Sequence, residues 1–248
     1  MVTTRYPSGS ELALPYMFGR DRLDKLDTDR PGILLIPGGG GTETSWQQGS
    51  LTQPNIITRL MHFLGQRGRR FLTFPSDWTW GNDEMIGRID DALAQAQAEH
   101  AFAERVHLIL VSMGGTGLNW SRQNPEKVAS QTLIVPVVDQ QDIYDNDLVA
   151  PYGTIQPPET AFGGNRPPDS HVPARNAEDF REIPTEIWYS NNDPVCRPQV
   201  IVPFAEAARA RRHNLGNQYP AGWAIPGHAA DNLPLQHVAD FIASYDEQ

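Results

Sequence analysis

The sequence predicts an α/β fold in which a mostly parallel sheet carries helices on both faces. Three observations favour this fold. Short apolar runs alternate with segments of helical spacing along most of the 248 residues. Glycine-rich turns follow several of the apolar runs, where a strand would turn towards a helix. The run Val106–Val111 has the apolar character of a strand that is buried on both faces of a parallel sheet.

The elements can be assigned in chain order. The segments Val2–Tyr6 and Glu11–Phe18 flank a Pro-Ser-Gly-Ser turn and predict an N-terminal hairpin. Further strands are predicted at Gly32–Ile36, Arg70–Phe74, Val106–Val111, Gln131–Val138, Glu186–Tyr189 and Tyr219–Ile225. Helices, recognised where apolar residues recur at intervals of three and four, are predicted at Pro54–Gln66, Glu84–Ala103, Gly114–Arg122, Val200–Arg212 and Leu235–Tyr245.

The stretch Asp139–Pro184 differs from the rest of the chain, because it contains seven prolines and has neither helical nor strand periodicity. A connection this long inside a compact domain is usually a lid or binding loop, or it is disordered. We therefore expect a single domain over residues 1–248, with a lid or binding insertion at residues 139–184.

Composition argues against several classes of function. The net charge is −10 and the chain has only two lysines, whereas binding to nucleic acid requires clustered Lys and Arg. No apolar run reaches the roughly 18 residues of a membrane span, and the first 20 residues lack the apolar block of a secretory signal. We expect a soluble protein, cytoplasmic or exported by another route. The single cysteine, Cys196, excludes an internal disulfide.

No metal and no cofactor are expected from the motifs. No pair of histidines has the His-Glu-x-x-His spacing of a zinc helix. The acidic cluster Asp139, Asp142, Asp145 and Asp147 could hold calcium, but it lacks the glycine and terminal glutamate of an EF-hand loop. A solvated, helix-capping loop is the better interpretation of this cluster.

The segment His107–Gly115 carries the strongest functional signal. A buried strand ends at Ser112 and passes through Met113 and two glycines directly into a helix. Such a sharp turn exposes the serine hydroxyl at the carboxyl edge of the sheet. It also points the N–H of Met113 to where a tetrahedral oxyanion would form. The alternative is that Ser112 is only a helix N-cap before a glycine-eased turn.

This order of elements resembles the α/β-hydrolase superfamily over nearly the whole chain. The family's Gly-x-Ser-x-Gly elbow is matched by Leu110–Gly114, with leucine at the first glycine, so the elbow needs room beside Leu110. The glycine-rich end of Leu34–Gly41 resembles the family's oxyanion loop, which implies that the N–H groups of Gly39, Gly40 and Met113 form the oxyanion hole. A nucleotide phosphate loop is the alternative, but its Gly-Lys-Ser/Thr ending is absent.

Two further loops resemble those that complete the family's triad. Trp188–Val195 is similar to the strand and acid loop, with Asp193 as the acid and Asp139 as its rival, and Ile225–Ala230 is similar to the histidine loop. The resemblance implies a serine hydrolase that cleaves a carboxylic ester through an acyl-enzyme. Ser112 would be the nucleophile, His228 the base and Asp193 the residue that orients the base. Acyltransferases and peptidases share these parts, and a non-catalytic ligand-binding protein on the same fold is the rival class.

The substrate is less constrained. Trp78 and Trp80 lie in a loop that is predicted at the same edge of the sheet as Ser112. Together with Trp46, they could line an acyl pocket or stack on a sugar. An equally good alternative is that the two loop tryptophans pack in the core and position the next helix. The negative charge favours neutral lipid, glycan or small alcohol esters.

The insertion would cover Ser112, and its residues Tyr152 and Phe162 would contact the substrate. Residues 135–153 are also similar to predicted hydrolases of actinobacteria and their phages, which makes a cell-envelope ester conceivable.

Overall fold

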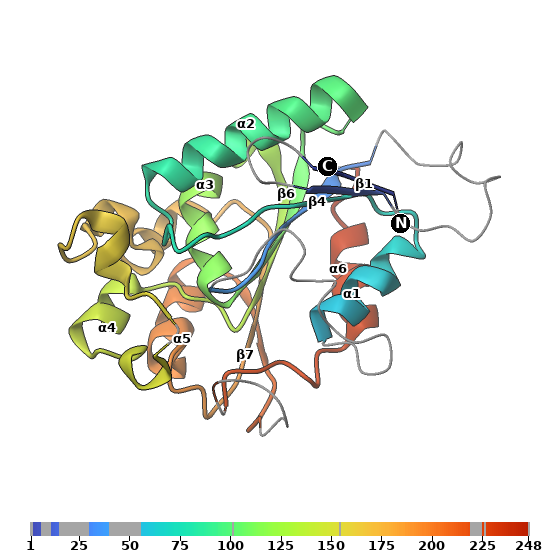
Figure 1. Ribbon diagram of the computed structural model, residues 1–248. Coiled ribbons are helices and arrows are strands. Elements are labelled where there is room, and N and C mark those ends of the chain that lie inside the picture. The colour runs from blue at the N-terminus through green and yellow to red at the C-terminus, as the bar shows by residue number, and fades with distance from the viewer. Residues whose placement is uncertain are drawn as a thin grey trace.

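The computed structural model describes residues 2–5, 11–14, 30–39, 56–100, 102–153, 155–218, 225 and 227–247. Within these ranges one sheet has the strand order β1-β2-β4-β3-β5-β6-β7-β8 (Figure 1). The strands are β1 (Val2–Arg5), β2 (Glu11–Leu14), β3 (Gly32–Ile36), β4 (Phe71–Thr73), β5 (Val106–Val111), β6 (Val128–Ile134), β7 (Thr185–Tyr189) and β8 (Arg211–Asn214).

The sheet is parallel from β4 to β8, and β1 and β2 extend it as an antiparallel hairpin. The predicted hairpin and the predicted α/β architecture are therefore confirmed. The α-helices are α1 (Ile56–Gly65), α2 (Asp83–His100), α3 (Leu118–Gln123), α4 (Gln140–Asp145), α5 (Pro198–Ala207) and α6 (Leu235–Ala243). None of the helices in the described part of the chain is long and apolar enough to cross a membrane.

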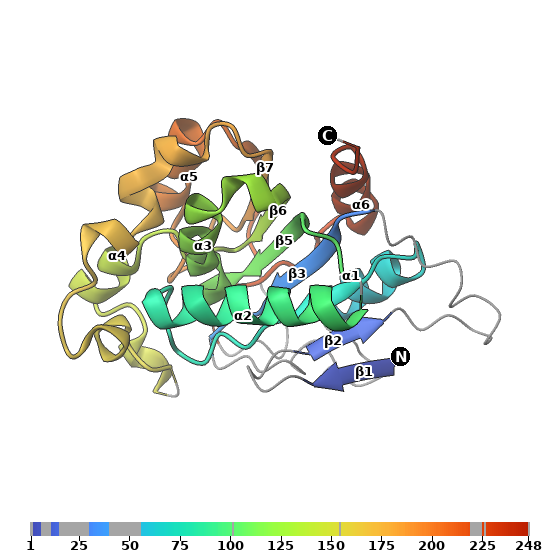
Figure 2. The ribbon, with the colours of Figure 1, turned by 90° about the horizontal axis from the view of Figure 1, so that it is seen from above.

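Two hydrophobic clusters lie on the two faces of the sheet. In β3, Leu34 and Ile36 join the larger cluster with residues of α2, α3 and α5, whereas Ile33 and Leu35 join the smaller cluster with residues of α1 and α6. Figure 2 shows the corresponding layers of helices on either side of the strands. Because alternate side chains of a strand point to opposite faces, a strand covered on both faces must be apolar throughout.

The last part of the sheet corrects the sequence-based assignment. A helix was predicted over Val200–Arg212, but α5 ends at Ala207 and the chain forms β8 at Arg211–Asn214. Arg209, with a φ of +56°, interrupts the helical course. β8 is an edge strand, so its charged side chains remain in solvent, and its sequence lacks the apolar signal of the inner strands. The predicted strand Tyr219–Ile225 lies outside the described residues, apart from Ile225.

The insertion at residues 139–184 contains more structure than its sequence indicated. It begins with α4 and continues through short 3₁₀ helices. These are η5 (Ala150–Tyr152), η6 (Pro158–Phe162), η7 (Asp169–His171) and η8 (Pro173–Phe180). Val172 and Phe180 are fully buried. The segment is therefore packed onto the domain through its own apolar side chains.

Candidate active site

Ser112 lies at the carboxyl end of β5 in a strained turn. Its φ is +54°, a left-handed conformation that is uncommon for a residue with a side chain. The carbonyl of Ser112 accepts a hydrogen bond of 2.8 Å from the N–H of Val137, which fixes the turn against the segment after β6. Gly114 is required by packing, because a Cβ there would lie 2.2 Å from the carbonyl oxygen of Ile36. The predicted helix at Gly114–Arg122 begins as a 3₁₀ helix over Ser112–Gly117 and continues as α3.

Leu110, which stands where the elbow motif has its first glycine, is fully buried in the larger hydrophobic cluster. The room that it needs is supplied by Gly117. A Cβ at Gly117 would lie 3.3 Å from Cδ2 of Leu110 and 2.7 Å from Cδ1 of Ile36. The leucine is thus accommodated by a glycine at the base of α3, and the turn at Ser112 keeps its shape.

The side chains of Ser112, His228 and Asp193 form one chain of hydrogen bonds. Nε2 of His228 lies 2.7 Å from Oγ of Ser112, and Nδ1 lies 2.7 Å from Oδ2 of Asp193. Oδ1 of Asp193 accepts hydrogen bonds from the N–H groups of Val195 (2.9 Å) and Cys196 (2.8 Å). Because a carboxylate can only accept, Nδ1 must carry a proton, which leaves Nε2 free to accept the proton of the serine hydroxyl.

The histidine loop and the acid loop are in direct backbone contact. Gly227 has a φ of +87°, and a Cβ there would lie 2.1 Å from the carbonyl oxygen of Asn192. Only glycine permits this approach. The contact sets the distance between the loops that carry His228 and Asp193.

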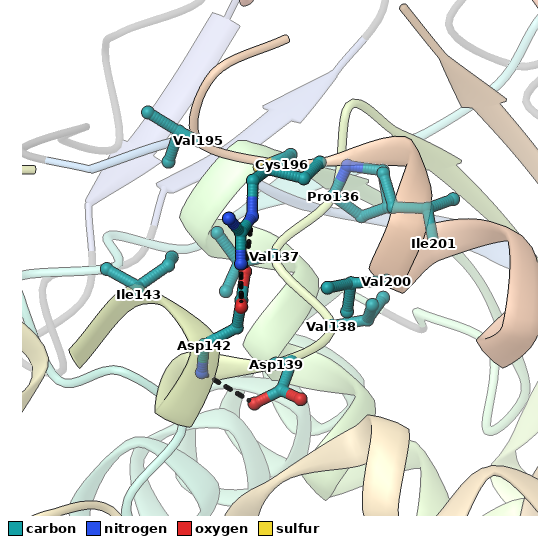
Figure 3. Close-up of a pocket in the computed structure, with 11 residues that line it drawn as sticks. Pro136, Val137, Val138, Asp139, Asp142, Ile143, Val195, Cys196, Val200 and Ile201 are labelled. Carbon is teal, nitrogen blue, oxygen red and sulfur yellow. Dashed lines mark hydrogen bonds and ion pairs between the residues drawn. The ribbon is translucent and has the colours of Figure 1, made fainter. Parts of the chain in front are cut away.

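The rival acid, Asp139, is engaged elsewhere. Its Oδ1 accepts a hydrogen bond of 2.9 Å from the N–H of Asp142 and so caps the N-terminus of α4. Burial raises the pKa of the Asp139 carboxyl, and the hydrogen bond from Asp142 only partly offsets this. Figure 3 shows the Asp139 carboxylate turned towards the first turn of the helix. The structure therefore brings Asp193, and not Asp139, to His228.

Figure 3 also shows a small pocket between α4, the segment after β6 and the acid loop. Within it, the guanidinium of Arg197 makes a two-pronged ion pair with Asp142, with Nε 2.9 Å from Oδ2. Cys196, next to Arg197 in the chain, is buried in the pocket wall. This pair ties the root of the insertion to the loop that holds Asp193.

The expected oxyanion loop is described up to Gly39. A Cβ at Gly39 would lie 2.8 Å from the ring of Trp78 and 3.7 Å from Sδ of Met113. Oγ of the buried Ser76 donates a hydrogen bond of 2.9 Å to the carbonyl oxygen of Gly38. Since a trans peptide points its C=O and N–H in opposite directions, this bond fixes the direction of the Gly39 N–H. Sequence reasoning missed Ser76, although it lies in the loop that was singled out for its tryptophans.

The other predicted binding residues have different positions. Trp78 is partly exposed beside Gly39, whereas Trp80 is 1% exposed in the core and donates a hydrogen bond to the carbonyl oxygen of Gln156 (3.1 Å). The 1% exposure of Trp80 fits the alternative that this tryptophan packs in the core and argues against the predicted contact with a substrate. Tyr152 and Phe162 are partly buried against the larger hydrophobic cluster. Gly40 and Trp46, also predicted for the site, lie outside the described residues.

Comparisons with known proteins identify the fold. No family model and no curated protein sequence matches this chain. A fluorophosphonate-binding serine hydrolase of Staphylococcus aureus, FphF, superposes with a TM-score of 0.68 at 14% identity, over 100% of this chain and 97% of that one. An S-formylglutathione hydrolase of Agrobacterium tumefaciens gives a TM-score of 0.64 at 11% identity, over 99% and 93% of the two chains.

A puromycin hydrolase is similar over a smaller share of its length. It gives a TM-score of 0.63 at 15% identity, and the match covers 98% of this chain but 38% of that one. The present chain thus spans little more than a third of that protein. At such identities the comparisons establish the architecture, and this chain has the α/β-hydrolase fold, as its sequence predicted.

Proposed function

We propose that this protein is a serine hydrolase that cleaves a carboxylic ester through an acyl-enzyme intermediate. One observation carries the proposal: His228 lies 2.7 Å from both the Ser112 hydroxyl and the Asp193 carboxylate. The strained backbone of Ser112 adds support, because strain of this kind clusters at functional sites. The names of the similar structures include several hydrolases, which supports the same class of reaction.

This geometry supports a two-step reaction. His228 takes the proton of Ser112 through Nε2 while Oγ attacks the ester carbonyl carbon. Asp193 holds the imidazole in the tautomer that can accept this proton, and then stabilises the imidazolium. The N–H groups of Met113 and Gly39 donate to the developing oxyanion, a contribution worth about 3 kcal/mol per donor in well-studied serine hydrolases. His228 then protonates the leaving alcohol, and water releases the acid from Ser112 by the reverse sequence.

The surroundings favour a neutral substrate with an apolar part. Trp78 lies against Gly39 and presents a partly exposed ring beside the proposed oxyanion hole. The net charge of −10 disfavours polyanionic substrates. Esters of neutral lipids, glycans or small alcohols are the substrates that we propose.

We further propose that residues 139–184 cover the site and select substrates by size. Several hydrogen bonds fasten the insertion to the loop after β4, and side chains of that loop donate two of them. The indole of Trp80 donates to the carbonyl oxygen of Gln156, and the side-chain amide of Asn82 donates to that of Ala161 (3.2 Å). A cover held in this way would exclude water and strengthen the hydrogen bonds to the oxyanion.

Labelling with a fluorophosphonate probe tests the catalytic proposal without knowledge of the substrate. We expect one label per chain, on Ser112, and its loss in folded Ser112→Ala. Ser170→Ala is the matched control. Ser170 also contacts a histidine, His171 (3.1 Å), and His171 contacts Asp83 (3.1 Å). This serine, however, lies on the surface and not in a strand-to-helix turn. Labelling that persists in Ser112→Ala, or a folded wild type that takes no label, would overturn the proposal.

An acyltransferase would be labelled at the same serine, so labelling does not distinguish hydrolysis from acyl transfer. Product analysis separates these two reactions. With a p-nitrophenyl ester and an added alcohol acceptor, we expect free acid as the main product. Predominant transfer of the acyl group to the alcohol would favour the acyltransferase.

A further inference from the structure

A second cluster of chemically reactive side chains lies under the C-terminal helix. Glu186 on β7 is completely buried, His213 lies on the neighbouring strand β8, and His237 projects from α6 with its side chain 47% exposed. Oε2 of Glu186 lies 3.7 Å from Nε2 of His213 and 3.6 Å from Nε2 of His237. The three ligand atoms all lie within 4.8 Å of one another. Carboxylate and imidazole groups therefore converge on one point from three elements.

The cluster leaves polar atoms without partners. Oε1 of Glu186 accepts a hydrogen bond from the Thr132 hydroxyl (2.9 Å). Among the described residues Oε2 makes no well-formed hydrogen bond, and neither does the buried indole N–H of Trp188, which lies near enough to lower the Glu186 pKa. The buried Nε2 of His213 has none either. Separations of 3.6–3.7 Å are too long for hydrogen bonds in any tautomer. Because buried polar atoms are nearly always satisfied in folded proteins, this group requires an explanation.

We infer that Glu186, His213 and His237 bind a divalent transition-metal ion of the zinc type. Two histidines and one glutamate form a donor set that zinc accepts in proteins, with bonds of about 2.0–2.2 Å. Tetrahedral bonds of that length place ligand atoms about 3.3–3.5 Å apart. The observed separations of 3.6 and 3.7 Å are longer by only a few tenths of an ångström. The half-exposed His237 leaves a route from solvent for the ion, and a water molecule would complete the tetrahedral set.

Neighbouring groups hold these ligands in place. The ring of Trp188 stacks on His213 at 4.0 Å between centroids, with an interplanar angle of 17°, and meets His237 edge to face at 5.2 Å. Thr132 anchors the other oxygen of Glu186. Contacts of this kind orient metal ligands and raise affinity.

The surroundings of the cluster are both buried and charged. Burial lowers the pKa of His213, with help from the nearby His237 and Arg211. Burial raises the pKa of Glu186 to about 7, and the Thr132 hydroxyl, the Trp188 indole and Arg211 act in the opposite direction. Arg211 is the fixed positive charge that faces the cluster; its guanidinium also lies over the ring of Phe241 and bonds the hydroxyl of Tyr245.

A bound ion would fasten α6 to the edge of the sheet. α6 follows the histidine loop in the chain, and β8 is an edge strand with few apolar contacts of its own. The ion would therefore stabilise the fold and take no part in the chemistry at Ser112. This role is independent of whether the protein hydrolyses esters.

Calorimetric titration of the chelator-treated, full-length protein with ZnCl₂ tests the site. We expect one zinc ion per chain, and a rise in Tm of roughly 5 °C or more at a hundredfold excess of zinc over Kd. His237→Ala, which changes a half-exposed residue, and Glu186→Gln should each weaken binding more than tenfold. His62→Ala removes an exposed histidine of α1 and should bind zinc as the wild type does.

A cobalt spectrum separates this site from a rival one. Asp193, Cys196 and His228 also lie close enough to hold an ion, although burial raises the pKa of the Cys196 thiol well above its usual value and so disfavours the thiolate. Co²⁺ bound by His213, His237 and Glu186 gives no thiolate-to-cobalt charge-transfer band. Such a band, unchanged binding in His237→Ala and Glu186→Gln, or no zinc binding by the folded wild type would each overturn the proposal.

Discussion

The ionisation of Glu186 should make the metal-free protein less stable at neutral pH than in mild acid. The side chain has no exposed surface, and burial raises the pKa of its carboxyl from the usual 4.5 to about 7. The Thr132 hydroxyl, the indole N–H of Trp188 and the charge of Arg211 favour the ionised form but do not outweigh burial. The folded protein therefore holds a proton that the unfolded chain has lost over the whole interval between these two values.

The sign and size of the effect follow from proton linkage. Where the folded state binds the additional proton, the free energy of unfolding decreases as pH rises. The contribution of Glu186 is thus most favourable below pH 4.5, declines through pH 7 and is constant above it. At 1.36 kcal/mol per pKa unit, the change from pH 5 to pH 8 is about 2 to 3 kcal/mol.

Glu186→Gln isolates this contribution, because glutamine keeps the shape and the hydrogen bond from Thr132 without the charge. Urea unfolding is measured at pH 5 and pH 8 in the presence of a chelator. From pH 5 to pH 8 the wild type should lose about 2 to 3 kcal/mol more of its unfolding free energy than the variant does. Glu126→Gln, at an exposed position, should behave as the wild type. Equal pH dependence in wild type and Glu186→Gln would refute the reasoning.

Four further variants address the candidate active site. Asp193→Asn should leave Tm nearly unchanged and lower kcat for an ester by about 10⁴-fold. Asp139→Asn keeps the cap of α4 and should retain the wild-type kcat. A larger loss of kcat in Asp139→Asn than in Asp193→Asn would exchange the roles of the two aspartates. Gly114→Ala places a Cβ 2.2 Å from the Ile36 carbonyl oxygen, so Tm and fluorophosphonate labelling should both fall, and normal labelling would contradict this. Phe162→Ala should shift the preferred acyl length in a p-nitrophenyl ester series more than it shifts Tm; an unchanged series would exclude a covering role.

The elements around Ser112 were predictable because their signals are local. β5 has the predicted bounds, Val106–Val111, since a strand buried on both faces must be apolar at every position. Glycines directly after a serine at the end of a buried strand, as after Ser112, indicate a tight turn. The room for Leu110, by contrast, depends on Gly117 and on Ile36 from a different strand, and no local pattern could indicate that contact.

Other features depend on partners that are distant in sequence. β8 is extended because it pairs with β7, and its own sequence, Arg-Arg-His-Asn, has no strand signal. In the insertion, the side-chain amides of Asn119 and Gln140 both donate to the carbonyl oxygen of His171, at 2.8 and 2.7 Å. Tertiary hydrogen bonds of this kind order a proline-rich segment that lacks periodicity, so sequence reasoning could locate the insertion but not its short helices.

The cluster of Glu186, His213 and His237 also depends on partners that are distant in sequence. It allows a further test of the proposed metal site. In β7, Glu186 and Trp188 share a face by simple alternation, but only the folded chain shows that this face is covered. Without zinc, the charged carboxylate destabilises the fold at pH 8, so Glu186→Gln should be more stable than the wild type. With zinc in excess, the wild type gains the binding free energy that the variant has lost, and the order of stability should reverse. A glutamate with a purely structural role would change stability in the same direction under both conditions.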